Sequence, residues 1–463
     1  MVEARNVDAY ESSFGSARGS ARGALCGGCG SSSESGDEED TSESVTEDDS
    51  GEELRDDGRG LLRDCPVEEQ PPVRAMLFVM LCMFQGYALM IGPPQQKLKG
   101  ALNIGQSGSR AFWFTQLCVL VHWGKFVARL GHNVVFACLT PMMRVYISMI
   151  FMLIGCAVPA ISVFWLGSTS ILNVFVSYLF SGIGLGVFEC TFLSVVTPLG
   201  KLTKAWAIMG APLGIGSVCI LGMLCTSYGM PVEALYWYAA ACIPAGMLTL
   251  HLCGPGSEAH SGKGSTEQAS LSSSLLEWSS WLPLVLPHIL AKIVVNFVME
   301  NATPVNFYVY NDSDEVPLLR PGGTHNLVSH DKFFAVLYIF VIFGDTLSRR
   351  LPYAFSLDAY STNVWFLVAA GACSILGFYL ESLAVAVVAL PAVFLAFWGN
   401  GLVYGVSARY IDRSVPKEHN LAAYSFWCFV GDAGSIAGGM TVDFVRRWIC
   451  QGHVYPYECL DHN

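Results

Sequence analysis

The stretch Met143-Arg-Val-Tyr-Ile-Ser-Met-Ile-Phe-Met-Leu-Ile-Gly-Cys-Ala-Val-Pro-Ala-Ile-Ser-Val-Phe-Trp-Leu166 decides the fold class, because it contains no charged residue after Arg144. A helix needs about 20 mostly apolar residues to cross the hydrocarbon core of a bilayer. Shorter apolar runs are typical of buried helices in soluble proteins, but this one is long enough to span a membrane. It therefore predicts a transmembrane helix over 143–166.

The same pattern recurs along the chain. Of the 463 residues, 52% are hydrophobic and only 14% are charged, and the mean hydropathy is +0.45. Soluble domains carry about 25% charged residues. We therefore predict an all-α polytopic membrane protein, a major-facilitator-like bundle of about eleven transmembrane helices. The predicted spans are 73–92, 111–137, 143–166, 170–197, 206–228, 232–253, 281–300, 333–347, 361–380, 383–409 and 421–445.

Polar segments divide the chain into domains. Residues 1–72 hold much of the acid, so the net charge of −12 belongs mainly to this segment and does not indicate a nucleic-acid partner. With little to bury, it is predicted to be a disordered cytosolic tail. The Ser/Gly-rich stretch 254–280 is a predicted cytosolic linker between a six-helix bundle (73–253) and a second bundle (281–445). Two sets of helices joined in this way are typical of major-facilitator carriers.

The basic residues predict the orientation, because cytosolic loops carry an excess of Lys and Arg. With a cytosolic N-terminus, the inward side holds Lys125, Arg129, Arg144, Lys201, Lys204, Lys263, Arg349, Arg350, Arg409, Arg413 and Lys417. The outward loop 301–332 then carries two glycosylation sequons, at Asn301 and Asn311. The tail 446–463 is predicted to be luminal, so that Cys450 and Cys459 are candidates for a disulfide.

Ionisable residues within apolar spans are candidates for function, because burying a charge is costly. Glu189 follows the glycines at 182, 184 and 186, which lie in a membrane run with no preceding strand. These glycines therefore predict close helix packing rather than a dinucleotide loop. Glu189 itself is predicted either to bind substrate or a proton, or to be a structural carboxyl paired with a neighbouring helix.

The span 281–300 carries a polar stripe, since Lys292, Asn296 and Glu300 are spaced by four residues and share one helical face. Such a stripe favours a position facing a cavity. Glu300 lies at the end of the span, where water can solvate it. Lys292 is the candidate counter-charge for Glu189.

Three further residues complete the candidate pathway for substrate or protons: Asp345, Asn400 and Asp432. Asp345 precedes Arg349 and Arg350, so it is predicted to pair with arginine at the cytosolic mouth, as a gate or as an anchor.

No catalytic constellation accompanies these residues. The sequence contains no HExxH, GxSxG or Walker motif, so we predict no enzyme, no metal site and no cofactor. Most of the sixteen cysteines lie in apolar runs, where they act as small apolar residues. Cys26 and Cys29 lie in the tail without a second metal-ligating pair.

Several segments resemble the battenin family of ceroid-lipofuscinosis neuronal membrane proteins. Glu189-Cys-Thr-Phe-Leu-Ser194 is similar to that family's Glu-Val-Thr-Phe-Leu-Ser, although two extra residues separate Glu189 from the glycines. Arg144-Val, Glu418-His-Asn-Leu-Ala422 and Gly431-Asp432-Ala-Gly434 also resemble battenin segments, but the Arg and Phe of the Glu-x-Arg-Glu-Phe-Ala segment are missing. The similarity covers spans three to five and eight to eleven.

A second family, the equilibrative nucleoside transporters, shares the predicted architecture. Gly344-Asp345 through Arg350 resembles its Asp-x-x-Gly-Arg segment, with Ser348 in place of the Gly, and Gly399-Asn400-Gly401 resembles its Ser-Asn-Gly. The tryptophan motif of its first span is absent from 73–92.

The tail favours battenin, because Asp57 followed after three residues by Leu61 and Leu62 fits the acidic dileucine signal that clathrin adaptors bind. Battenin-like proteins are lysosomal, whereas nucleoside transporters are more often at the cell surface. The resemblance implies a lysosomal or vacuolar transporter that works by alternating access and affects luminal pH. Its substrate would be a small polar metabolite of the glycerophosphodiester or basic amino acid class, and proton coupling is one option for its transport. The alternatives are a nucleoside transporter at the plasma membrane and a membrane scaffold in endolysosomal trafficking.

Overall fold

The structure is a computed structural model of the whole chain. It describes residues 74–105, 109–254, 274, 276–310, 315–319, 325–355, 360–383 and 385–452. The predicted acidic tail and most of the predicted linker lie outside these residues.

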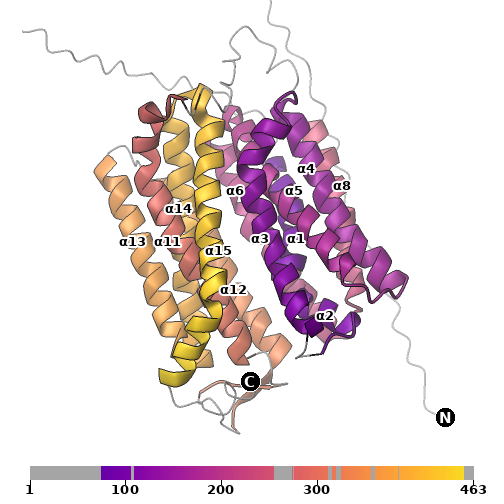
Figure 1. Cartoon of the computed structure of the whole chain (residues 1–463). Helices are drawn as coiled ribbons and strands as arrows, with labels where there is room; N and C mark the ends of the chain where they lie inside the picture. The colour runs from indigo at the N-terminus through magenta and orange to yellow at the C-terminus, as the bar shows by residue number, and fades with distance from the viewer. Residues whose placement is uncertain are drawn as a thin grey trace, which may run out of the picture. The chain divides into compact units, whose positions relative to one another are not determined.

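The first half of the described chain consists of helices packed in one group (Figure 1). They are α1 (Ala75–Ile91), α2 (Pro94–Ala101), α3 (Ser109–Val135), α4 (Pro141–Val158) with the π-helical η1 (Pro159–Trp165), α5 (Leu172–Val196) with the 3₁₀ helix η2 (Thr197–Leu199), α6 (Lys201–Gly216), the π-helical η3 (Ser217–Gly222), α7 (Met223–Ser227) and α8 (Glu233–Cys253). Within this group α4 and α3 pack on α5, while α1 packs on α6 and α8.

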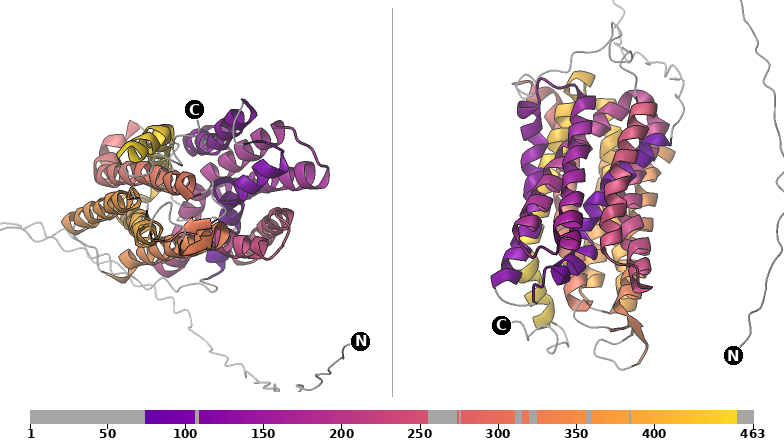
Figure 2. Two further views of the ribbon diagram at one scale, coloured as in Figure 1. Left: turned by 90° about the horizontal axis from the view of Figure 1, so that it is seen from below. Right: turned by 90° about the vertical axis from the view of Figure 1, so that its right-hand side faces the viewer.

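The second half forms a second group beside the first (Figure 2). It contains α11 (Trp278–Tyr310), a hairpin of β1 (Glu315–Pro317) and β2 (Leu327–Ser329), α12 (His330–Ala354), α13 (Tyr360–Glu381), α14 (Ala386–Ser414), η4 (Lys417–His419) and α15 (Asn420–Gly452). Here α14 packs on α12 and α13, and α11 packs on α15. The hairpin lies at the same end of the bundle as α2 (Figure 1).

The two groups meet along two lines of helix contact. The first joins α3 and α5 to α15, and the second joins α6 and α7 to α12. A cluster of buried apolar residues crosses between the groups: Cys190, Leu193 and Ile208 from the first pack with Tyr404 and Trp427 of the second. The described helices therefore form two bundles with a shared core.

A helical segment lies at each of the eleven predicted spans, and the all-α membrane fold is confirmed. Within the described residues, however, only seven helices are long and apolar enough to cross a membrane, or eight if the pair α1 and α2, bent by 54°, counts as one broken span. The predicted spans 111–137, 333–347 and 421–445, which became α3, α12 and α15, do not meet that standard. Each of these helices carries several charged residues, and the ones within the bundle, Lys125, Arg129, Asp345, Arg349 and Asp432, are buried.

The glycines before Glu189 pack α5 closely against two neighbours, as the sequence predicted. A Cβ added at Gly182 or Gly186 would lie 2.5 Å from Val121 O or 2.7 Å from Lys125 O, both on α3. One added at Gly184 would lie 2.7 Å from Ser148 O on α4. Small residues allow helix backbones in membranes to approach in this way. The glycines therefore bring the polar end of α5 against α3.

A bulkier residue at this contact should loosen α5 from α3. We expect Gly186→Val to destabilise the protein by about 1–3 kcal/mol, because the added atoms overlap the α3 backbone. Thermal unfolding of the purified protein in detergent measures the effect. Gly131→Ala is the matched control, since a Cβ there meets nothing within 4 Å. Equal melting temperatures for the two variants would show that the close contact does not stabilise the bundle.

Candidate functional site

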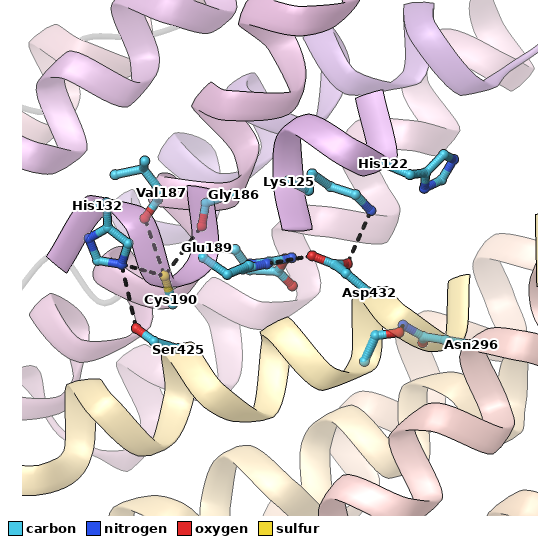
Figure 3. A network of polar contacts seen from close by, with 12 residues as sticks. His122, Lys125, His132, Gly186, Val187, Glu189, Cys190, Asn296, Ser425 and Asp432 are labelled. Carbon is cyan, nitrogen blue, oxygen red and sulfur yellow. Dashed lines mark hydrogen bonds and ion pairs between the residues drawn. The ribbon is translucent and has the colours of Figure 1, made fainter. Parts of the chain in front are cut away.

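The candidate site is a network of charged side chains where α3 and α5 meet α15 (Figure 3). Arg129 of α3 lies at its centre. Its Nη2 is 2.6 Å from Glu189 Oε2 on α5, and its Nε is 2.8 Å from Asp432 Oδ2 on α15. Arg129 and Asp432 are each only 3% exposed. One guanidinium therefore binds two buried carboxylates that come from different bundles.

Lys125 extends the network by one turn of α3. Its Nζ lies 3.4 Å from Asp432 Oδ1 and 3.3 Å from the hydroxyl of Tyr87 on α1. A further turn along α3, His122 Nδ1 lies 3.8 Å from Glu300 Oε1 on α11. Positions 122, 125 and 129 thus present one polar face of α3 to the second bundle.

A smaller polar cluster lies on the C-terminal side of Arg129 along α3. Cys190 Sγ lies 3.3 Å from His132 Nε2, and Ser425 Oγ lies 3.5 Å from the same nitrogen (Figure 3). These three buried residues come from α5, α3 and α15, so polar contacts continue along the whole meeting line of the three helices.

The structure corrects the partner that the sequence suggested for Glu189. Arg129, not Lys292, forms the ion pair with this carboxylate. Lys292 Nζ instead contacts Asn400 Oδ1 at 3.3 Å and lies 5.4 Å and 5.5 Å from the ring centroids of Tyr404 and Trp427. Among the residues that the structure describes, no carboxylate lies within 4 Å of Lys292.

Asn400 links Lys292 to the pair formed by Asp345 and Arg349. Its Nδ2 donates to Asp345 Oδ1 at 3.1 Å, and Asp345 Oδ2 is 2.9 Å from Arg349 Nη2. The Arg349 guanidinium also lies over the Tyr404 ring, 4.1 Å from its centroid. Lys292, Asn400, Asp345 and Arg349 thus form a continuous polar chain across α11, α14 and α12.

Asn296 binds a backbone group, since its side-chain amide donates to Gly431 O at 2.8 Å. It therefore joins α11 to α15 immediately before Asp432. All six predicted pathway residues thus belong to two adjoining clusters. One contains Glu189 and Asp432, the other contains Lys292, Asp345 and Asn400, and Asn296 connects α11 to the first.

A separate ion pair joins the two bundles near one end. Lys204 Nζ on α6 is 2.6 Å from Asp412 on α14, 2.8 Å from the hydroxyl of Tyr424 on α15 and 2.9 Å from Thr197 Oγ1. Lys204 is only 2% exposed. This contact lies where α14 ends and α15 begins, the end that the basic residues predict to be cytosolic.

Four of the basic residues predicted for the inward loops are instead enclosed within helices and paired with acids. Lys125, Arg129, Lys204 and Arg349 are all buried, and each contacts a carboxylate. The signal for Lys125 and Arg129 was present in the sequence, because two basic residues spaced by four within an apolar run mark one face of a helix.

The predicted glycosylation of Asn301 is also corrected. Asn301 lies within α11, is 1% exposed, and donates a hydrogen bond to Phe297 O at 2.9 Å and another to Thr441 Oγ1. A glycan cannot be attached to an amide enclosed in this way.

Other predicted features fall outside the described part of the chain. They are the second sequon at Asn311, the dileucine residues Asp57, Leu61 and Leu62, and the thiols of Cys450 and Cys459.

Comparison with known proteins identifies the fold. No family model matches the chain, and neither does any curated protein sequence. Solved structures do match, among them the E. coli fucose:proton symporter FucP, at TM-score 0.53 and 14% identity over 82% of this chain and 91% of that one. The human organic anion transporter MFSD10 matches at TM-score 0.55 and 14% identity over 82% and 95%. A POT family transporter matches at TM-score 0.55 and 11% identity over 81% and 90%. The chain therefore has the fold of the major facilitator transporters.

The shared position of Arg129 predicts unequal effects of neutralising its partners. Arg129→Gln leaves Glu189 buried without a cation at short range and leaves Asp432 with Lys125 alone. Breaking buried pairs in this way costs about 3–5 kcal/mol. Glu189→Gln should cost less, because Arg129 keeps its contact with Asp432. Thermal unfolding in detergent compares the two variants, with Lys97→Gln at an exposed pair as control. A larger loss for Glu189→Gln would contradict the central role of Arg129.

Proposed function

We propose that this chain is a transporter that moves a small anionic metabolite across a lysosomal or vacuolar membrane by alternating access. Three features support the proposal: the major-facilitator fold, the buried charges where the bundles meet, and the resemblance to battenin. Charges are costly to bury in a membrane and are retained where they serve a solute or ion pathway.

The ammonium group of Lys292 is the observation that carries the substrate class. It lies midway along α11, with an amide and two aromatic rings of α14 and α15 around it but no described carboxylate within 4 Å. The neighbouring Arg129 also has a buried Nη1 that lacks a hydrogen-bond partner among the described residues. Both groups are cationic donors that a bound anion would satisfy.

Of the two substrate classes that the battenin resemblance implies, this arrangement favours the glycerophosphodiester. Its phosphate would give Lys292 the anionic partner that no described carboxylate provides within 4 Å, and its hydroxyls could hydrogen-bond to the side chains of Asn296 and Asn400. A basic amino acid would add a cation to a region that already holds Lys125, Arg129 and Lys292.

A nucleoside is the second candidate substrate, and one contact favours it. Asp345 and Asn400, which carry the resemblance to nucleoside transporters, are hydrogen-bonded to each other at 3.1 Å. A carboxylate and an amide placed together can bind the hydroxyls of an uncharged sugar. Uptake of both compounds therefore belongs in one experiment.

Transport in proteoliposomes tests the substrate class. We expect the wild-type protein to move a labelled glycerophosphodiester, and Lys292→Gln to slow this flux by about 10–100-fold, because a charged hydrogen bond contributes about 1.5–3 kcal/mol. Lys292→Arg should retain part of the flux, and Lys97→Gln should leave it unchanged. Lysine and uridine are the competing substrates. If the protein transports lysine or uridine but not the phosphodiester, the assignment of an anionic substrate is wrong, while the assignment as a transporter still holds.

The location rests on the dileucine signal, and a localisation experiment tests it. Leu61→Ala together with Leu62→Ala should move the protein from lysosomes towards the cell surface, because adaptors would no longer bind the tail. Leu54→Ala, in the same acidic segment, is the control. Fluorescence microscopy with a lysosomal marker gives the measurement. An unchanged lysosomal pattern would show that the dileucine residues do not direct the protein to lysosomes. A surface pattern for the wild-type protein would favour the nucleoside transporter.

A further inference from the structure

Two arginines from different bundles lie over one tryptophan ring. Arg74, just before α1, has its Cζ 5.1 Å from the centroid of Trp206 on α6. Arg350, near the end of α12, has its Cζ 4.8 Å from the same centroid. Each distance is within the range of a cation–π interaction. One ring thus contacts two cationic groups that come from different bundles.

Neither guanidinium has an acidic partner. Within the described residues, no carboxylate lies within 4 Å of Arg74 or Arg350, and both side chains are exposed. Arg349 differs, because it is buried and paired with Asp345 at 2.9 Å. Both exposed guanidiniums therefore have N–H donors that no described carboxylate binds, and an anion could accept hydrogen bonds from them.

The position of this group fits a membrane surface. α1 and α6 begin, and α12 ends, at the end of the bundle opposite to α2 and the hairpin (Figure 1). The basic residues predict that this end faces the cytosol. Tryptophan is enriched at the level of the lipid headgroups. Basic pockets between transmembrane helices on this side of a membrane bind phosphorylated headgroups.

We propose that Arg74, Trp206 and Arg350 bind the phosphate group of an anionic lipid of the cytosolic leaflet. The planar guanidinium presents paired N–H donors that match phosphate oxygens. One headgroup bound here joins α1 and α6 of the first bundle to α12 of the second. Such a lipid stabilises the arrangement in which these helix ends are adjacent. The site lies at the membrane edge and is independent of the substrate proposed above.

Thermal unfolding of the full-length protein in a neutral detergent tests the site. The probes are dioctanoyl phosphatidylinositol phosphate, dioctanoyl phosphatidylcholine and soluble inositol bisphosphate. We expect the first probe to raise the melting temperature of the wild-type protein in a saturable manner, and the second to have no effect. Arg74→Gln and Arg350→Gln should each weaken the apparent affinity about fivefold, and the double variant should lose the response.

Two controls separate binding from a structural role. Arg110→Gln removes an exposed arginine in the first turn of α3, where it donates to Thr169 O. This residue lies at the end of the bundle opposite to the proposed site, so the variant should keep the full lipid response. Arg74→Lys with Arg350→Lys retains the charge and should keep more of the response than the double Gln variant.

Three results would overturn the proposal. If the Gln variants melt at a lower temperature but respond to the lipid with unchanged affinity, the arginines only support the fold. If inositol bisphosphate is as effective as the lipid, the ligand is a free phosphate compound. If no lipid response occurs, the arginines do not bind a headgroup and serve only their contacts with Trp206.

Discussion

The ion pairs of Arg129 are the interaction on which the rest of the bundle interface depends. A guanidinium within a membrane protein is stable only where carboxylates and hydrogen bonds replace the water that it has lost. Glu189 and Asp432 provide them, at 2.6 Å and 2.8 Å. Glu189 reaches Arg129 because Gly182 and Gly186 let α5 approach α3 at backbone distance. The polar network therefore depends on the small residues, because the close packing of α5 on α3 brings the Glu189 carboxylate to Arg129.

The two bundles are joined unequally at their two ends. At one end, Lys204 is almost fully buried and contacts Asp412 at 2.6 Å, together with Tyr424 and Thr197. At the other end, Lys97 is exposed, Asp331 is half-buried, and their charged atoms are 3.7 Å apart. An exposed pair contributes about 0–1 kcal/mol, whereas separating a buried pair leaves two charges without partners. The contact between the ends of α6 and α14 therefore resists opening more strongly than the opposite contact does.

The sequence predicted the helices well, because their signal is local. The span predicted over 170–197 corresponds to α5, and the one over 111–137 to α3. Candidate residues such as Glu189 and Asp432 were found for the same reason, since a carboxylate in an apolar run is unusual wherever it lies. Their partners were not found, because a partner depends on which helix is adjacent and how it is rotated. Asn301 shows the same difficulty: α11 continues beyond the predicted end of its span, so a residue expected in a loop is enclosed against α15.

The two carboxylates beside Arg129 come from different bundles, so the electrostatic potential at this site changes when the bundles move apart. Glu189 belongs to the same bundle as Arg129 and Lys125, whereas Asp432 belongs to the other. Any motion that withdraws α15 from α3 removes one negative charge from two cations and leaves only Glu189 beside them. The wall formed by α3 and α5 thus becomes electropositive as it becomes accessible, and returns to near neutrality as it closes. Attraction for an anion would then be greatest in the open states and weakest in the closed one. The movement that exposes this wall to the solute therefore also makes it positively charged.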